Sequence, residues 1–111
     1  MAILERTLTG DFTTILTELD AVVKQSVSAT LEGSSDFNFS TGRCAVRVYE
    51  RYSAIGNSRV TMSLTLLEAD GQIRLSAITS GGSQAVFFKI NTWGEEAFLD
   101  ALRGIVEEYG R

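Results

Sequence analysis

The sequence predicts an α+β fold, in which one antiparallel sheet of five to six strands carries two helices packed on one face. Two segments near the ends of the 111-residue chain repeat apolar residues at steps of three and four, as amphipathic helices do. Between them the repeat changes to two, which is typical of strands, and Asp-Gly and Gly-Gly pairs mark tight turns. The expected order is strand, helix, five strands, helix, and the length fits a single domain over residues 1–111.

The first helix is predicted over residues 11–27, after a strand over residues 3–8. Asp11 follows Gly10 and can accept hydrogen bonds from the first free backbone amides, as an N-cap does. A second strand is expected somewhere within residues 29–40, although Gly33 and the two serines after it interrupt the pattern. The apolar side of the helix comprises Phe12, Ile15, Leu16, Leu19, Val22, Val23 and Val27.

The second helix is predicted to start at Thr92, because Thr92 and Glu95 have the spacing of a capping box. Gly104 weakens this helix by about 1 kcal/mol relative to Ala, and close packing against the sheet would explain its presence. The apolar stripe comprises Phe98, Ala101, Leu102, Ile105, Val106 and Tyr109.

Four strands are predicted near residues 43–53, 59–68, 72–80 and 84–90, and their turns set the register. An Asp70-Gly71 turn places Leu66 opposite Leu75, and a Gly81-Gly82 turn places Leu75 opposite Phe88. The expected inner face, under the helices, comprises Cys44, Val46, Val48, Val60, Met62, Leu64, Leu66, Ile73, Leu75, Val86, Phe88 and Ile90.

The turn between the first two of these strands has two alternatives. A two-residue Gly56-Asn57 turn sets Val48 against Thr65 and mixes the faces, whereas a three-residue loop over residues 55–57 sets Val48 against Leu64. The longer loop is predicted because it keeps apolar residues opposite apolar residues.

This register puts six of the ten basic residues on the outer face, without an acidic residue among them, in a chain of net charge −4. The six are Arg43, Arg47, Arg51, Arg59, Arg74 and Lys89. Clustered arginines bind phosphate or carboxylate, and Tyr49 and Phe87 add planes for stacking. The predicted binding residues are Arg47, Tyr49, Arg51, Arg74, Phe87 and Lys89. The alternative is that these charges only face water.

Composition argues against catalysis. Histidine, the commonest general base and transition-metal ligand, is absent, and Cys44 is the single cysteine. Glu50 and Glu68 both lie at positions that point to the expected inner face, as an acid–base pair of carboxylates would. Their places at strand ends, near the rim of the sheet, explain these charged residues more simply. We expect a non-enzymatic binding module without cofactor or metal.

The expected partner is an anionic small molecule or an acidic protein surface. Nucleic acid is disfavoured by a pI near 4.7. A homodimer is an alternative, because Tyr49, Leu67, Ile78 and Phe87 make the expected outer face more apolar than contact with water alone requires. Stacking two such faces would, however, bring twelve positive charges together. A ligand carrier or enzyme with a cavity between sheet and helices, or a homo-oligomeric structural protein, is also left open. With neither a signal peptide nor a membrane-spanning stretch in the sequence, a cytoplasmic location is expected.

Two stretches, RCAVRVYERYS at residues 43–53 and SAITSGGSQAVFFKINTWGEEAFL at residues 76–99, resemble a small bacterial family of unknown function, mostly from Gram-positive anaerobes. The order of elements also resembles the halves of TATA-box-binding protein and, in decorated form, helix-grip proteins. These resemblances imply an antiparallel sheet with helices on one side, and they imply no activity and no site residues.

Overall fold

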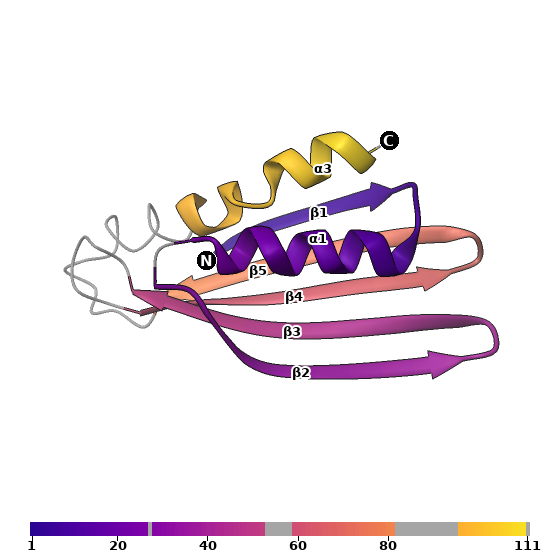
Figure 1. Cartoon of the computed structure of the whole chain (residues 1–111), viewed down its shortest axis with the longest axis horizontal. Helices are drawn as coiled ribbons and strands as arrows, with labels where there is room; N and C mark the ends of the chain where they lie inside the picture. Colours follow the sequence, from indigo (N-terminus) through magenta and orange to yellow (C-terminus); the bar gives the residue numbers. More distant parts are fainter. Residues whose placement is uncertain (27, 53–58, 82–95, 111) are drawn as a thin grey trace.

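The computed structural model describes residues 1–26, 28–52, 59–81 and 96–110 and confirms the α+β class. In chain order the elements are β1 (Ala2–Leu8), α1 (Phe12–Lys24), β2 (Thr30–Phe39), β3 (Gly42–Tyr52), β4 (Arg59–Ala69), β5 (Gln72–Gly81) and α3 (Arg103–Tyr109). The five strands form one antiparallel sheet in the order β1-β5-β4-β3-β2 (Figure 1). Both strands predicted before residue 40, over 3–8 and within 29–40, are therefore present as β1 and β2.

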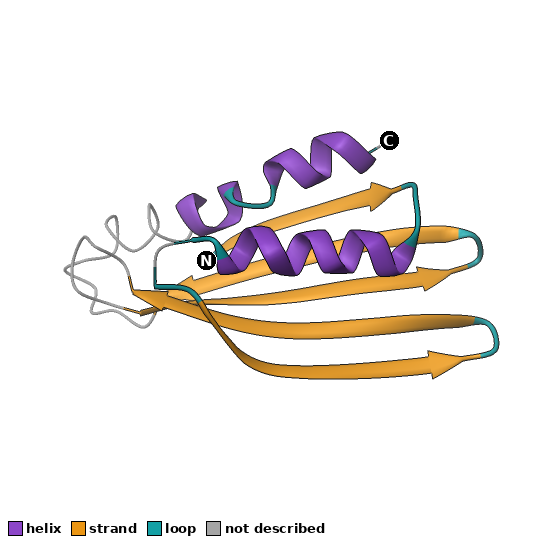
Figure 2. Ribbon diagram, in the orientation of Figure 1, coloured by secondary structure: helices purple, strands orange, loops and turns teal. Residues whose placement is uncertain are grey.

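Both helices lie on one side of the sheet, α1 across its middle and α3 along β1 (Figure 2). The buried positions of α1 are Phe12, Ile15, Leu19 and Val23. They belong to one core with the inward residues of the central strands, which are Val60, Met62, Leu64, Leu66, Ile73, Leu75 and Ala77. Burial of this shared apolar surface is what holds α1 on the sheet.

The N-cap of α1 is the predicted one. The Asp11 carboxylate accepts hydrogen bonds from the backbone amide and the hydroxyl of Thr14, both at 2.9 Å. These two bonds hold the pKa of Asp11 below its ordinary value. The helix ends at Lys24, one turn earlier than the apolar pattern indicates.

The C-terminal segment is helical over residues 96–100 and again in α3, with an interruption at Ala101 and Leu102. The predicted capping box falls outside the described residues, whereas most of the predicted apolar stripe is buried. The expectation for Gly104 is wrong, because this residue is exposed and an added Cβ would meet nothing within 4 Å. Instead, Tyr109 fastens α3: its hydroxyl donates to Glu18 of α1, and its carbonyl accepts from the Thr9 amide at 2.8 Å.

The β4–β5 hairpin has the predicted register, with Leu66 opposite Leu75 and Leu64 opposite Ala77. Its turn residues Asp70 and Gly71 have φ angles of 53° and 73°, in the left-handed region that such two-residue turns require. The predicted turn at residues 81–82 and the predicted strand over residues 84–90 lie outside the described residues.

The register predicted between β3 and β4 is wrong. Val48 lies opposite Ser63, not Leu64, and Arg47 takes the place opposite Leu64. A shift of one residue exchanges the two faces of a strand. Ala45 and Tyr49 are therefore buried under the helices, while Cys44, Val46 and Val48 face the other way. The predicted loop over residues 55–57 lies outside the described residues.

The burial of Tyr49 explains why this register is preferred. Its side chain is fully buried, and its hydroxyl donates a 2.7 Å hydrogen bond to Asp20 on α1. A tyrosine ring removes more apolar surface from water than a valine does, and the bond to Asp20 satisfies its polar end. The valines on the opposite face are only half-buried, so the opposite register would bury the smaller residues and expose the larger one.

Candidate functional site: the open face of the sheet

The structure divides the predicted basic cluster. Arg47, Tyr49 and Arg51 lie on the helical side of β3, whereas Arg74 of β5 points to the other face. Phe87 and Lys89 lie outside the described residues. The described members of the predicted site thus do not form one surface.

Two arginines on the helical side lie against aromatic rings. The guanidinium carbon of Arg43 is 4.2 Å from the centroid of the Phe12 ring, and its Nη1 donates to the Thr13 hydroxyl at 3.2 Å. Arg51 lies 4.8 Å from the Phe98 centroid, its Nε is buried without a hydrogen-bond partner, and burial lowers its pKa. Such long side chains can cover apolar surface with their stems.

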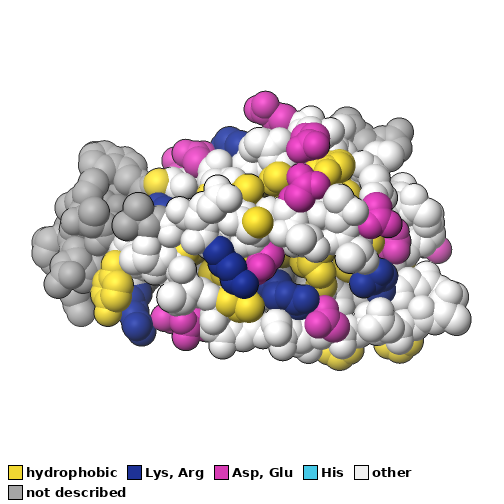
Figure 3. Space-filling model, in the orientation of Figure 1, with side chains coloured by type: hydrophobic (Ala, Val, Ile, Leu, Met, Phe, Trp, Pro, Cys, Tyr) yellow, Lys and Arg dark blue, Asp and Glu magenta, His cyan; other side chains and the backbone are white. Residues whose placement is uncertain are grey.

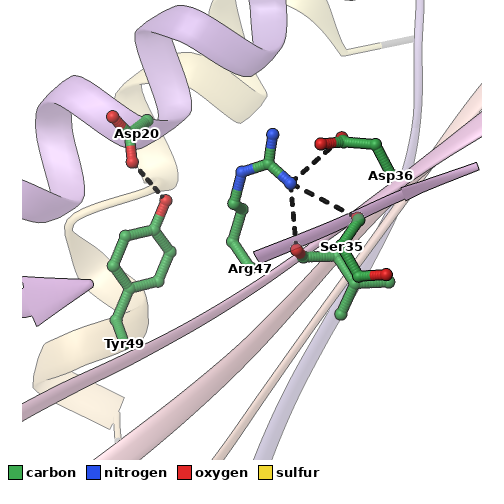
Figure 4. Close-up of polar contacts among 6 residues, drawn as sticks. Asp20, Ser35, Asp36, Arg47 and Tyr49 are labelled. Atoms are coloured by element: carbon green, nitrogen blue, oxygen red, sulfur yellow. Dashed lines mark hydrogen bonds and ion pairs between the residues drawn. The ribbon is translucent and has the colours of Figure 1, made fainter. Parts of the chain in front are cut away.

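Arg47 is held by groups of the protein itself (Figure 4). Its Nη1 lies 3.1 Å from an Asp36 carboxylate oxygen on β2 and donates to the Val46 carbonyl at 3.0 Å. Only 15% of its side chain is exposed. In the space-filling view, basic and acidic side chains alternate beside α1 on this side of the molecule (Figure 3). The helical side therefore presents charges of both signs and not a basic surface.

Asp20 connects α1 to β3. It accepts the Tyr49 hydroxyl, and its other oxygen lies 2.9 Å from the Lys24 ammonium. Burial alone would raise the pKa of Asp20, but the hydrogen bonds from Tyr49 and Lys24 outweigh it and leave this pKa below the ordinary value. The same contact and burial raise the pKa of the Tyr49 hydroxyl, so Tyr49 stays protonated and donates.

This contact gives a pH prediction. A carboxyl whose pKa is lowered by folding stabilises the protein above its unfolded pKa of about 4, and the effect is lost as the pH falls through the folded value. We expect Asp20→Asn to lower the free energy of unfolding by about 1–2 kcal/mol at pH 7. At pH 3 the penalty should be clearly smaller, as measured by urea unfolding at both pH values.

The control is Asp100→Asn, which changes a carboxylate paired with Arg103 on the surface. It should shift stability by less than about 0.5 kcal/mol at either pH. An Asp20→Asn penalty that is the same at pH 3 and pH 7 would contradict the role given to this carboxylate.

The face opposite the helices, here called the open face, is rich in apolar side chains. Among the described residues neither helix covers it, and five large apolar residues on it are between 38% and 73% exposed. These are Ile3, Phe37, Phe39, Leu67 and Ile78. Cys44, Val46 and Val48 lie between them and are half-buried. Exposed apolar groups gathered on one face mark interaction surfaces more often than scattered ones do.

Sequence reasoning places Leu67 and Ile78 on this face, as observed, but it misses the residues of β2 and β3 for two reasons. Phe37 and Phe39 belong to β2, whose position and faces could not be fixed from its pattern of small polar residues. The register expected from the sequence assigns Cys44, Val46 and Val48 of β3 to the core. The available signal was the shared parity of the two phenylalanines in β2.

Among the described residues, charges on the open face are few and of both signs. At one corner, Nη1 of Arg59 lies 3.2 Å from Oε1 of Glu50. The negative charge of Glu50 raises the pKa of Arg59, and Glu32 at the bulge of β2 raises it further. Glu5 and Arg74 are diagonal neighbours on β1 and β5. Because Glu50 faces this side and Glu68 lies opposite Ile73 on the other, the two carboxylates weighed in the sequence do not form an acid–base pair.

The hollows found on the described surface are polar or shallow. One of about 750 Å³ lies at one end of the sheet, between the β2–β3 turn, the β4–β5 turn and the end of β1 with the residues that follow it. Another, of about 280 Å³, lies between β1 and α3. Within the ranges given above, no group of three or more His, Cys, Asp or Glu residues could hold a metal. No helix among the described residues is long and apolar enough to cross a membrane.

A family model described as "Family of unknown function (DUF6054)" matches residues 1–110. The chain belongs to this family. The resemblance of two of its stretches to a small family of unknown function is thereby confirmed, and it extends over the whole chain. No curated protein matches the DUF6054 chain. The family description names neither a substrate nor a partner.

Proposed function

We propose that this chain is a non-catalytic interaction module that binds a protein surface through the open face of its sheet. The observation that carries this proposal is the gathering of five exposed large apolar residues on a sheet face that neither described helix covers. Antiparallel sheets often leave one face in water, but the residues that point to that face are then mostly polar. Here the outward positions of β3 hold Cys44, Val46 and Val48 instead.

The receptor for an anion suggested by the sequence has less support. It needs several arginines on one surface, and the arginines of β3 lie on the helical side, where Arg47 is already bound to Asp36. Of the described basic residues expected on that surface, only Arg59 and Arg74 point to the open face, and Arg59 is paired with Glu50. Anion binding and the cytoplasmic location stay predictions.

Cys44 provides a native probe of the open face, because its thiol is free and half-buried in β3 beside Leu67. We expect maleimide to label Cys44 roughly tenfold more slowly in intact cells than in dilute purified protein, the ratio for a face nine-tenths occupied. Labelling is followed by mass spectrometry after short reaction times.

The matched control is Cys44→Ser combined with Ala21→Cys, which places the thiol at an exposed position of α1. Its rate in cells serves as the reference for reagent uptake and should show no protection. For each thiol, the labelling rate in cells is divided by the rate in dilute protein. If this ratio is the same for the thiol at position 44 and the thiol at position 21, the open face is free in cells and the proposal is overturned.

A further inference from the structure

We infer that the occupant of the open face is a second copy of this chain, stacked sheet against sheet in a homodimer. This inference rests on the proposed function and names the partner of the same surface. It follows from the composition, charge and size of the open face.

The apolar residues extend across the sheet and are not confined to one corner. Leu67 lies on the central strand β4 and is 42% exposed, with Cys44 of β3 on one side and Arg74 of β5 on the other. Ile3 and Ile78 oppose each other on β1 and β5, and Phe37 lies beside Cys44 at the β2 side. Two such faces can interdigitate at the usual distance of about 10 Å between stacked sheets.

The charge of the open face permits stacking on itself. Its outward strand positions in the described ranges carry two arginines and two glutamates, with the Glu32 carboxylate at the edge. Two copies therefore do not bring together charges of one sign, and the objection of twelve positive charges does not apply to these residues. In a chain of net charge −4, two copies can therefore meet through this face without strong repulsion between the described charges.

The polar residues of the open face also suit a symmetric contact. Thr7, Ser63, Thr65 and Ser76 are hydroxyl residues, and a hydroxyl both donates and accepts hydrogen bonds. In a two-fold dimer both copies contribute the same patch of residues. Every polar group of the patch therefore has to find its partner among the residues of that patch. Hydroxyls satisfy one another, and Glu5 and Arg74 supply both signs.

The size of the open face matches a stable dimer. Five strands about 4.8 Å apart, each about 25–35 Å long, present on the order of 600–800 Å² of flat face. Stable interfaces bury about 800 Å² on each partner. A hollow of about 130 Å³ beside Leu67 and Arg74 gives the face relief into which a side chain of the second copy can fit.

The test is sedimentation velocity of the full chain over a range of concentrations. We expect wild-type protein to sediment at micromolar concentration as a species of twice the 12.1 kDa chain mass. Leu67→Glu should weaken the dimer by at least about a hundredfold, because each dimer would bury two carboxylates. Arg74 lies beside this position and can pair with the new carboxylate in the monomer, so the fold should be kept, as checked by circular dichroism.

The matched control is Ala21→Glu, which adds the same charge at an exposed position of α1 and should leave the dimer constant unchanged. A wild-type chain that stays monomeric at 100-fold higher concentration, or a dimer that Leu67→Glu leaves intact, would overturn the second-copy inference. If the chain is monomeric while Cys44 is still protected in cells, the proposed function stands with another protein as partner. If the chain is monomeric and Cys44 is unprotected, both fail.

Discussion

Replacing Tyr49 with Ala is expected to lower the free energy of unfolding by about 3–5 kcal/mol, the range for deleting a buried aromatic ring. The same truncation one residue earlier, Val48→Ala, should cost under about 1 kcal/mol, because Val48 lies on the open face. Urea unfolding measures both. The two variants are best compared in a Leu67→Glu background, so that association does not add to the effect of Val48.

This comparison tests which side of β3 faces the helices. The register expected from the sequence buries Val48 and exposes Tyr49, so it reverses the order of the two penalties. Tyr49→Phe separates the contributions: it keeps the ring and removes the 2.7 Å bond to Asp20, and should cost about 1–3 kcal/mol. A larger loss for Val48→Ala than for Tyr49→Ala would overturn the face assignment.

Gly42→Ala is expected to destabilise the sheet by about 1–3 kcal/mol, or more if the backbone cannot shift. A Cβ at this position of β3 would lie 2.3 Å from the backbone carbonyl oxygen of Glu68 on β4, closer than any real contact of this kind. The neighbour is main chain, so no side-chain rotation relieves the clash. The midpoint of urea unfolding, with its slope, is the measurement.

Gly33→Ala is the matched control, on the neighbouring strand β2. An added Cβ there meets nothing within 4 Å, and neither Gly33 nor Gly42 has a positive φ. Alanine at position 33 should therefore be neutral or stabilise by up to about 1 kcal/mol. Equal effects of the two substitutions would mean that the close approach of β3 to β4 is not what requires glycine at position 42.

The parts of the fold that could be predicted are those set by local chemistry. Asp11 has its hydrogen-bonding partner three residues away in Thr14, and the Asp70-Gly71 turn fixes the register of the strands on either side of it. These signals involve neighbours in sequence, so periodicity and turn residues capture them.

The face of β3 could not be predicted because the deciding partner is distant in sequence. Valines occupy one side of this strand, and a tyrosine with arginines occupies the other, so period-two alternation reads equally well in both directions. The choice depends on Asp20 of α1 accepting the Tyr49 hydroxyl, and on Phe12 lying under Arg43. The expected anion site depended on the wrong register. A shift of one residue moves every arginine of β3 from the open face to the helical side.

The pairing of β1 with β5 has a consequence for synthesis of the chain. Leu4 and Leu8 of β1 lie opposite Ala77 and Ile73 of β5, which follow them by 73 and 65 residues and are synthesised correspondingly later. Until β5 has been made, the apolar stripe of α1 can pack against only part of the sheet. Pairing of β1 with the sheet can therefore form only late in synthesis, and its apolar residues lack these neighbours until then.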